Sequence, residues 1–596
     1  MAIIFKAFCV FPLLIVSAYA HIFSLPFFDF GDAPKAIQKV ETGNDANDDG
    51  KKIAETGYNG KWELVSENSG VSAMHAILLP KINKVLMYDA TVWRTSKIPL
   101  PPQKMPCRVA DHITGELDCW CHSVLFDFET SELTALKLQT DTWCSSGGLT
   151  ADGDLVSTGG FGGGANTVRY LSTCDGCDWR EYPTALADPR WYSTQVTLPD
   201  GGFIVVGGRG AFSYEYIPPE GQSNKSPVFF PLLKDTTNDL KGIDGQEMFL
   251  IENNLYPFVY LSPDGNLFIF SNNRSILLDP KANKVVREFP ILTGGSRNYP
   301  ASAMSVLLPL KLRANNATAT KAKVLVCGGA QWDSFYFSET KKQFFPALQD
   351  CGRIDITKPN AVWKKERMPS PRVMGDMVIL PTEDILLLNG AKTGTSGWND
   401  AEDPNLVPAL YTPKGPSRQR FKELAAGTIP RMYHSSSVLL PDGTVLVAGS
   451  NTHNGYILDA KYPTELRVEK FSPPYLDPSL AWLRPSIVVD SSDKVIHYGQ
   501  RFSVKVKSNE LTVKNRDDLK LTMYAPAFTT HGISMNQRLL ILSLVKVIKN
   551  VGPATEGLHD IIALAPSSGA VAPPGYYLLY VVYKGVPSVA MWVQIK

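Results

Sequence analysis

Three side chains that can bind a metal ion occupy matching places in this sequence, and a fourth lies next to one of them. Cys144, Tyr192 and His434 each lie eight residues before the aspartate of an Asp-Gly turn, and Tyr433 directly precedes His434. An adjacent Tyr-His pair supplies a phenol oxygen and an imidazole nitrogen. A set of nitrogen and oxygen donors suits Cu(II). The pattern therefore predicts a metal site, provided that the fold brings these residues together.

The Tyr433–His434 pair taken alone also fits an ordinary protein core. Buried Tyr and His are common and are usually only hydrogen-bonded, so the pair by itself favours a structural role. The flanking motifs do repeat: DPRWYS contains Arg190, and IPRMYHSSS contains Arg431. SPRVMGD has the same frame, with Met374 at the place of the tyrosine. A metal site is thus predicted only from the convergence of several copies.

A repeat defines these matching places and fills most of the chain. Each copy has an apolar run, a turn such as Pro-Asp-Gly, a second apolar run, and then Gly-Gly or a small substitute. Copies begin at Leu78, Leu149, Thr197, Leu261, Lys321, Ile379 and Leu439. Their spacing of roughly 50 to 70 residues is near the period of kelch-type propellers. Asp-Gly between apolar β runs predicts a hairpin, and hairpins stacked around an axis bury their faces.

The repeat therefore predicts an all-β protein built on a seven-bladed kelch-type β-propeller, in preference to an ordinary sandwich with repeated hairpins. Equivalent positions of different blades lie at similar radius and height around the axis. Cys144, Tyr192, Tyr433 and His434 can then converge on one site although they are far apart in sequence. Tyr256 occupies the same position in another copy.

The pattern changes after the seventh copy. From Phe471 the sequence turns to short strands such as RFSVKVKS, LKLTMYAPA and GYYLLYVVYKG, which predict an immunoglobulin-like β-sandwich. The predicted organisation is a signal peptide at 1–20, a leader at 21–56, the propeller at 57–470 and the sandwich at 471–596.

The composition argues against nucleic acid or an anionic membrane as the main partner. Lys plus Arg is 59 and Asp plus Glu is 58, so no basic excess is present. The apolar run from Ala7 to Val16, followed by a small-x-small cleavage site that ends at Ala20, predicts a secretory signal. The run is too short to span a bilayer. Sequons for glycosylation, which fit secretion, occur at Asn224, Asn273 and Asn316.

Eight cysteines remain once Cys9 leaves with the signal, and most should form disulfides in a secreted chain. The expected pairs are Cys174 with Cys177, Cys327 with Cys351, and Cys107 with either Cys119 or Cys121. Cys144, in TWCSSGG, has no obvious partner.

The motifs TWCSSGG, RWYSTQ, IPRMYHSSS and APAFTTHGISMNQR resemble the glyoxal oxidase and galactose oxidase family of copper radical oxidases. The resemblance covers nearly the whole chain after the leader. It implies a thioether cross-link between Cys144 and Tyr192, which forms a radical cofactor. It also implies one copper ion bound by Tyr192, Tyr433, His434 and His531, with Cys144, Tyr192 and Tyr433 as the catalytic residues. If Cys144 is cross-linked, one cysteine of the remaining seven should be a free thiol.

The resemblance implies a secreted enzyme of the cell wall or apoplast that oxidises aldehydes such as glyoxal or methylglyoxal to carboxylic acids while O2 is reduced to H2O2. Galactose oxidase stacks a Trp over the cross-linked ring, and this chain has Gly210 at that place, which argues against galactose. An oxidase of galactose or other cell-wall alcohols is the alternative, and a non-catalytic kelch binding module is a more remote one. The expected partners are a small aldehyde and O2, with a peroxide-consuming peroxidase as a further candidate and a monomeric state.

Overall fold

The computed structural model describes residues 56–111, 113–243, 248–313, 320–515, 517–550 and 557–596. The predicted signal peptide, the leader up to residue 55, Cys9 and the sequon at Asn316 lie outside these residues. Within the described ranges the chain is all-β, as expected, with two short α-helices, α1 (Pro231–Asp235) and α2 (Ser334–Lys341). No helix of the described part is long and apolar enough to cross a membrane.

Antiparallel sheets follow one another along the chain, each with four strands from the repeat part, and a hairpin of the C-terminal part extends the first of them to six. The repeat copies lie around the turn between the first two strands, except that the copy from Lys321 begins after the first strand of its sheet. In chain order the first four sheets are β2 (His75–Leu79), β3 (Lys84–Tyr88), β6 (Ser123–Phe126) and β7 (Leu133–Leu136); β8 (Ser146–Leu149), β9 (Leu155–Thr158), β10 (Val168–Leu171) and β11 (Arg180–Tyr182); β12 (Thr194–Thr197), β13 (Phe203–Val206), β14 (Ser213–Tyr216) and β15 (Val228–Phe229); β18 (Phe258–Leu261), β19 (Leu267–Ser271), β20 (Arg274–Asp279) and β21 (Lys284–Glu288).

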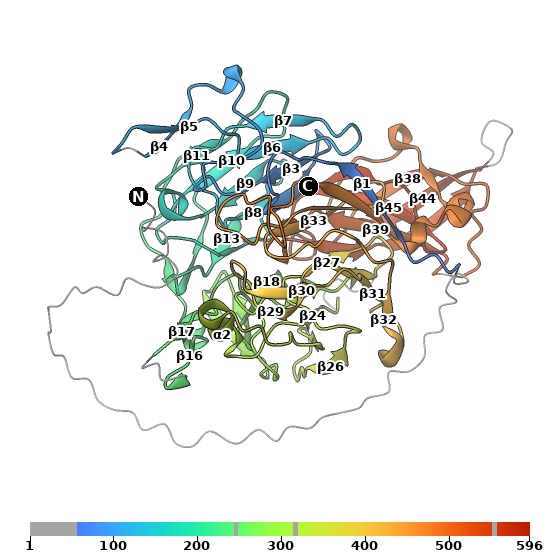
Figure 1. Cartoon of the computed structure of the whole chain (residues 1–596). Helices are drawn as coiled ribbons and strands as arrows, with labels where there is room; N and C mark the ends of the chain where they lie inside the picture. The colour runs from blue at the N-terminus through green and yellow to red at the C-terminus, as the bar shows by residue number, and fades with distance from the viewer. Residues whose placement is uncertain (1–55, 112, 244–247, 314–319, 516, 551–556) are drawn as a thin grey trace. The chain divides into compact units, whose positions relative to one another are not determined.

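The sheets that follow have the same form. They are β22 (Met304–Leu307), β24 (Lys323–Cys327), β25 (Asp350–Asp355) and β26 (Lys364–Arg367); β27 (Asp376–Ile379), β28 (Ile385–Leu388), β31 (Ala409–Tyr411) and β32 (Phe421–Glu423); β33 (Ser435–Leu439), β34 (Val445–Gly449), β35 (Val468–Ser472) and β1 (Lys61–Ser66). In the last sheet β1 pairs with β35, so the blue start of the described chain lies beside its orange strands (Figure 1).

The first strands of most successive sheets contact one another. β8 contacts β12, β12 contacts β18, β22 contacts β27, β27 contacts β33, and β33 contacts β2. The residue that precedes each first strand is thereby brought near its counterparts in the neighbouring sheets.

The C-terminal part forms two further sheets. One contains β36 (Ser486–Ile487), β38 (Arg501–Lys507), β44 (Leu558–Leu564) and β43 (Ser543–Lys549). The other contains β42 (Arg538–Ile541), β39 (Leu519–Ala525), β45 (Gly575–Tyr583), β47 (Met591–Ile595) and β37 (Val495–Ile496), with β46 (Val586–Pro587) beside β45 and β23 (Leu310–Lys311) beside β42. Short ribbons outside these sheets are β4 (Arg108–Asp111) with β5 (Glu116–Asp118), β16 (Asn238–Asp239) with β17 (Leu250–Ile251), and β29 (Ala391–Gly394) with β30 (Ala401–Pro404).

A hairpin of the C-terminal part, β40 (Phe528–Thr530) and β41 (Ile533–Met535), inserts among the first strands of the repeat sheets. β40 pairs with β2, and the two hairpin strands also contact β8, β12, β22, β27 and β33. Asn536 Oδ1 accepts from the backbone N–H of Thr197 at 2.8 Å, and Gln537 Oε1 accepts from that of Ile379 at 2.7 Å. These bonds fix the hairpin at a single depth.

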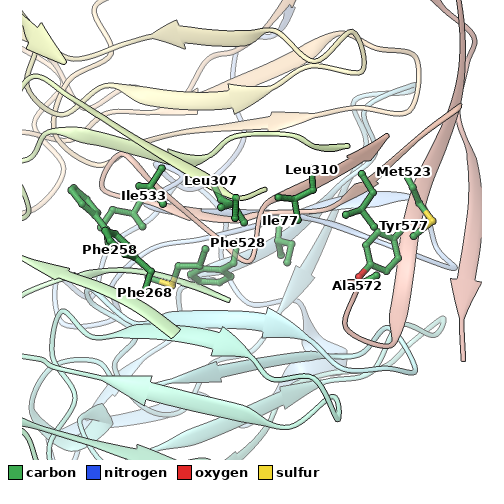
Figure 2. Close-up of a cluster of buried hydrophobic side chains, with 14 of the residues drawn as sticks. Ile77, Phe258, Phe268, Leu307, Leu310, Met523, Phe528, Ile533, Ala572 and Tyr577 are labelled. Atoms are coloured by element: carbon green, nitrogen blue, oxygen red, sulfur yellow. The ribbon is translucent and has the colours of Figure 1, made fainter. Parts of the chain in front are cut away.

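One buried apolar cluster joins the repeat sheets to the C-terminal part (Figure 2). Ile77 and Phe258 from the repeat sheets belong to it together with Phe528 and Tyr577 from the C-terminal part. Phe528 packs against β8 at Gly147, where an added Cβ would lie 2.6 Å from the phenyl ring. The shared core rules out a freely swinging C-terminal part.

The disulfides agree with the sequence expectation and settle its open choice. The predicted pairs Cys174–Cys177 and Cys327–Cys351 are confirmed, and Cys107 pairs with Cys119. Among the described residues the free cysteines are Cys121 and Cys144, both buried. The Cys121 thiol donates to the carbonyl of Ser123, which explains how an unpaired cysteine is accommodated.

Replacing Phe528 by Ala should lower the free energy of unfolding by about 3–5 kcal/mol, because it removes a fully buried ring from the shared core. The comparison is Phe229→Ala, at a ring that is 62% exposed, which should cost less than about 0.5 kcal/mol. Denaturant unfolding followed by fluorescence measures both. Equal effects of the two substitutions would show that the hairpin is not anchored by this ring.

Candidate metal centre

The repeat fixes an unusual backbone conformation at the residues singled out above. Cys144, Tyr192 and His434 have left-handed backbones with φ of 58°, 68° and 64°. The equivalent Tyr256 and Met374 share it, with φ of 43° and 59°. A left-handed non-glycine residue costs about 1–2 kcal/mol. Copies with and without a metal-binding side chain adopt this left-handed backbone, so the conformation is a property of the repeat. The sequence of each copy determines only which side chain stands at this position.

Backbone hydrogen bonds tie neighbouring copies at these positions. The N–H of Tyr192 donates to the carbonyl of Cys144 at 3.1 Å, and the N–H of Tyr256 donates to the carbonyl of Tyr192 at 2.6 Å. Cys144 and Tyr192 are therefore held side by side although 47 residues separate them along the chain.

Buried arginines of the repeated motifs anchor the segments that carry the phenols. Arg190 Nη1 donates to the carbonyl of Gly207 at 3.0 Å, and Arg431 Nη1 donates to that of Gly449 at 2.8 Å. Each guanidinium also pairs with a buried glutamate on the third strand of its own sheet, at 2.8 and 2.9 Å. These two arginines thus have a structural role: each holds the segment before the first strand against the Gly-Gly or Gly-Ser pair at the end of the second strand.

Cys144, His434 and His531 converge. Their candidate ligand atoms all lie within 4.8 Å of one another, and the Cys144 thiol lies 3.2 Å from His531 Nε2. The centroids of the His434 and His531 imidazole rings are 4.6 Å apart. His531 lies in the turn between β40 and β41, with φ of 51°, so it reaches the cluster only because the hairpin inserts. All three side chains are at most 5% exposed.

The imidazoles fit a metal ion. Neither ring nitrogen of His434 has a hydrogen-bond partner among the described residues, although the side chain is buried. Burial holds the pKa of His434 and of His531 well below the usual histidine range, so both rings are neutral, as metal ligation requires. His531 Nδ1 lies 2.6 Å from the hydroxyl of Thr530, a contact that orients the ring and leaves Nε2 toward the cluster. Buried nitrogens without partners are costly, and a bound cation removes that cost.

Phenol oxygens complete the donor set. The hydroxyls of Tyr192 and Tyr433 lie 3.2 Å apart, and the ring of Tyr433 stacks on that of His434 with centroids 3.8 Å apart. Burial raises the pKa of both phenols well above the usual value, and the Cys144 thiol raises that of Tyr192 further. A cation beside them reverses this effect, since it favours the phenolate.

All five residues singled out from the sequence therefore lie together, and the structure adds a phenol that sequence reasoning missed. The hydroxyl of Tyr299 lies 3.1 Å from that of Tyr192 and 2.9 Å from that of Tyr433. Tyr299 precedes β22, in the copy where a long insertion takes the place of the Asp-Gly turn. No register could be counted there, so the sequence carried no signal for it.

Tyr256 lies at the matching position of its copy, eight residues before Asp264, but not in any of the motifs that resemble the oxidase family. Its ring packs against His531 with centroids 5.0 Å apart, while its hydroxyl donates to the carbonyl of Ser145 at 3.0 Å. It lines the centre without directing its oxygen at the other phenols.

A tryptophan side chain also lies beside the centre, although position 210, where galactose oxidase has its Trp, is a glycine in this chain. Gly210 was expected to leave the Tyr192 ring without an indole. Trp191 instead lies beside that ring, with centroids 5.0 Å apart, and the guanidinium of Arg209 lies 5.5 Å from the Trp191 ring. The sequence signal for these indoles was the Trp that directly precedes both Cys144 and Tyr192, in TWC and RWY.

Trp191 belongs to a larger aromatic layer. The ring centroid of Trp143 lies 4.9 Å from those of Trp191 and Trp93, and the Trp143 ring stacks on Trp398 with centroids 5.3 Å apart. The indole N–H groups of these four residues are buried without a hydrogen-bond acceptor in the described chain. Unpaired donors are unfavourable, although ring faces accept N–H weakly. The layer limits the contact of water with Tyr192.

A cavity of about 60 Å³ lies elsewhere, between the repeat sheets and the C-terminal part. Thr197, Arg538 and Tyr577 are among its lining residues, which include none of the five predicted site residues.

Comparisons with known proteins agree with the motifs. Residues 74–475 match a family model described as glyoxal oxidase N-terminus, and residues 484–595 match one described as galactose oxidase-like, early set domain. The chain is 59% identical over 541 residues to a protein named aldehyde oxidase GLOX1 of Arabidopsis thaliana, covering 91% of this chain and 85% of that protein. It is 42% identical over 542 residues to aldehyde oxidase GLOX of Vitis pseudoreticulata, covering 90% and 97%.

A solved structure shares the fold. It is a fungal alcohol oxidase of the AA5 family in complex with copper, with a TM-score of 0.64, 18% sequence identity, and coverage of 90% of this chain and 100% of that one.

Copper binding should depend on the two imidazoles. His434→Ala or His531→Ala should weaken Cu(II) binding by more than about 100-fold, since loss of a partner that only orients a ligand already costs 10–100-fold. Tyr433→Phe should bind copper much more tightly than either. Calorimetric titration of the metal-free protein measures these affinities, with the exposed His497→Ala as the control. Wild-type affinity in both histidine variants would exclude this centre as the copper site.

Proposed function

This chain belongs to the glyoxal oxidase family, and on that premise we propose that it is a secreted copper radical oxidase that converts small aldehydes to carboxylic acids. An aldehyde, water and O2 give a carboxylic acid and H2O2, so the hydrated aldehyde loses two protons and two electrons. The observation that supports this best is the convergence of Cys144, His434 and His531 beside the Tyr192–Tyr433 pair.

The residues proposed to hold copper are Tyr192, Tyr433, His434 and His531. Their donors are two phenol oxygens and two imidazole nitrogens, a set that suits Cu(II). Copper, when bound, would supply a one-electron redox centre beside Tyr192, which in its oxidised form takes up the other electron.

The reaction assigns different parts to the two phenols. Tyr433 takes the hydroxyl proton of the hydrated aldehyde as general base. Tyr192, oxidised to a radical and joined to Cys144 by a thioether, takes the hydrogen atom from carbon. The sulfur spreads the unpaired electron beyond the ring and lowers its potential. The 3.2 Å between the two hydroxyl oxygens allows both transfers from one small substrate.

Burial protects this chemistry. Cys144, Tyr192 and Tyr433 are 0%, 4% and 2% exposed, and the indole of Trp191 lies beside the Tyr192 ring. Exclusion of water strengthens the electrostatic interactions inside the centre and limits quenching of a reactive radical by solvent.

The finer architecture is part of the proposal. The ring of repeat sheets is a seven-bladed kelch-type β-propeller at 57–470, and the C-terminal sheets form an immunoglobulin-like sandwich at 471–596. The contacts between first strands, the pairing of β1 with β35 and the boundaries of the two family matches support it. A glycosylated monomer secreted to the cell wall or apoplast, near a peroxidase that consumes H2O2, fits the disulfides.

Oxygen uptake by the copper-loaded protein tests the substrate class. Methylglyoxal should be oxidised at least about tenfold faster than galactose, a barrier difference of about 1.4 kcal/mol, and H2O2 should form in equal amount. Faster turnover of galactose would favour the alcohol oxidase alternative. Uptake with neither substrate would favour a binding module.

The thioether is tested by mass spectrometry. In copper-loaded, air-exposed protein, the peptides that contain Cys144 and Tyr192 should stay linked after full reduction of disulfides, and the chain should lack the two hydrogen atoms lost on linkage. Cys144→Ser should fold and bind copper but oxidise aldehydes poorly. Cys121→Ser, at the other buried free thiol, should leave both the link and the activity intact. Two separate peptides from the wild type would refute the cross-link.

A further inference from the structure

Arg538 is a buried cation without an acidic partner. The described chain pairs most of its buried arginines with a carboxylate: Arg169, Arg190, Arg297, Arg353, Arg420 and Arg431. Buried Arg372 has the carboxylates of Asp376 and Glu423 near enough to act on its charge. Arg538 is only 5% exposed, and no carboxylate of the described ranges acts on it in this way.

Backbone carbonyls satisfy only part of the Arg538 guanidinium. Nη1 donates to the carbonyl of Val571 at 2.7 Å and to that of Ala570 at 3.5 Å, and Nη2 donates to that of Leu261. A guanidinium has five N–H groups, so Nε–H and one N–H of Nη2 have no acceptor among the described residues. Burial lowers the pKa of Arg538 to about 10, so the side chain is still charged at neutral pH. A buried charge without a counter-charge is strongly unfavourable.

The cavity of about 60 Å³ between the repeat sheets and the C-terminal part adjoins this guanidinium. One water needs roughly 10–15 Å³ of such space, so the cavity takes about four waters or one small organic molecule. Arg538 is the one charged residue among its lining residues, and Thr150 and Tyr260 bring hydroxyl groups. Val196 and Leu307 contribute to an apolar wall.

We propose that this cavity binds a small monocarboxylate, whose carboxylate pairs with Arg538 and whose hydrocarbon part lies against the apolar wall. One negative charge balances the guanidinium, and a planar carboxylate accepts from two of its N–H groups at once. Chloride gains nothing from an apolar wall. Sulfate brings a second negative charge, which no other cation of the lining balances. The cavity volume fits an acid anion of about two or three carbon atoms.

The site lies where the two parts of the chain meet. Arg538 joins the carbonyl of Leu261, in the repeat sheets, to that of Val571, in the C-terminal part. Asn536 and Gln537, which hold the β40–β41 hairpin among the repeat sheets, line the same cavity. A bound carboxylate therefore stabilises the seating of the hairpin, and a ligand that binds only the folded chain raises its stability.

Thermal unfolding of the metal-free, full-length protein tests the site. The metal-free form excludes any effect of carboxylate binding to copper. Sodium acetate at about 20 mM should raise Tm by at least about 2 °C relative to sodium chloride at equal ionic strength. In the same samples, saturation-transfer NMR should show contact between the acetate methyl group and the protein.

Two variants alter the site in different ways. Arg538→Lys keeps the charge but loses the planar fork, and Ala525→Leu fills the cavity but keeps the guanidinium. Each should lose more than half of the Tm rise that acetate causes. Arg372→Lys is the matched control, because Arg372 is buried and donates to backbone carbonyls but does not line the cavity. It should keep the full rise, measured from its own Tm in chloride.

Three results would overturn the inference. The first is an equal Tm in acetate and chloride for the wild type. The second is a rise of wild-type size in Arg538→Lys or in Ala525→Leu. The third is loss of the rise in Arg372→Lys as well, which would trace the effect to general destabilisation. Aldehyde oxidation plays no part in these measurements, so a failure of the proposed function would leave the inference standing.

Discussion

The insertion of the β40–β41 hairpin among the first strands of the repeat sheets is the constraint on which the centre depends. The hairpin presents His531 to Cys144 and His434, which come from different sheets. Asn536 and Gln537 satisfy backbone groups of the strands that receive it. Without the hairpin these strands would lose hydrogen bonds and apolar contacts together, so the metal donors and the core are stabilised by the same insertion.

The centre collects several features that are unfavourable in isolation. Cys144, Tyr192 and His434 have left-handed backbones, the imidazole nitrogens of His434 have no hydrogen-bond partner in the described part of the chain, and the phenols are buried. Such features persist where the surrounding structure over-determines them, and they cluster at functional sites. Here the buried arginine clamps, the backbone bonds between neighbouring copies and the shared apolar cluster hold them in place.

Burial also links the fold to the chemistry. It raises the pKa of Tyr192 and Tyr433 and lowers that of His434, which leaves a neutral donor set poised for a cation. The same exclusion of water that makes these groups costly makes their mutual interactions strong. A layer of indoles beside Tyr192 extends the exclusion to the ring proposed to carry a radical. One physical condition, low polarity around the centre, thus serves metal binding, proton transfer and radical stability.

The sequence by itself determined the all-β class and the candidate residues. Asp-Gly turns between apolar runs are local signals, and counting back from them located Cys144, Tyr192 and His434 on a common register. The motif around His531 added the residue that no register could reach. Local turn chemistry and motif identity need no knowledge of distant contacts, which is why these predictions were available.

Only the tertiary structure decided how these side chains meet, and what else meets them. Tyr299 lies in a copy that lacks the Asp-Gly turn from which positions are counted. Trp191 lies beside the Tyr192 ring, whereas the Trp expected from galactose oxidase would stand at position 210. Cys107 forms its disulfide with Cys119 and not with Cys121, because the backbone brings the Cα atoms of Cys107 and Cys119 to 4.8 Å from each other. These outcomes depend on distances between segments far apart in the chain, and such distances are set by the packing of sheets and hairpin rather than by any local pattern.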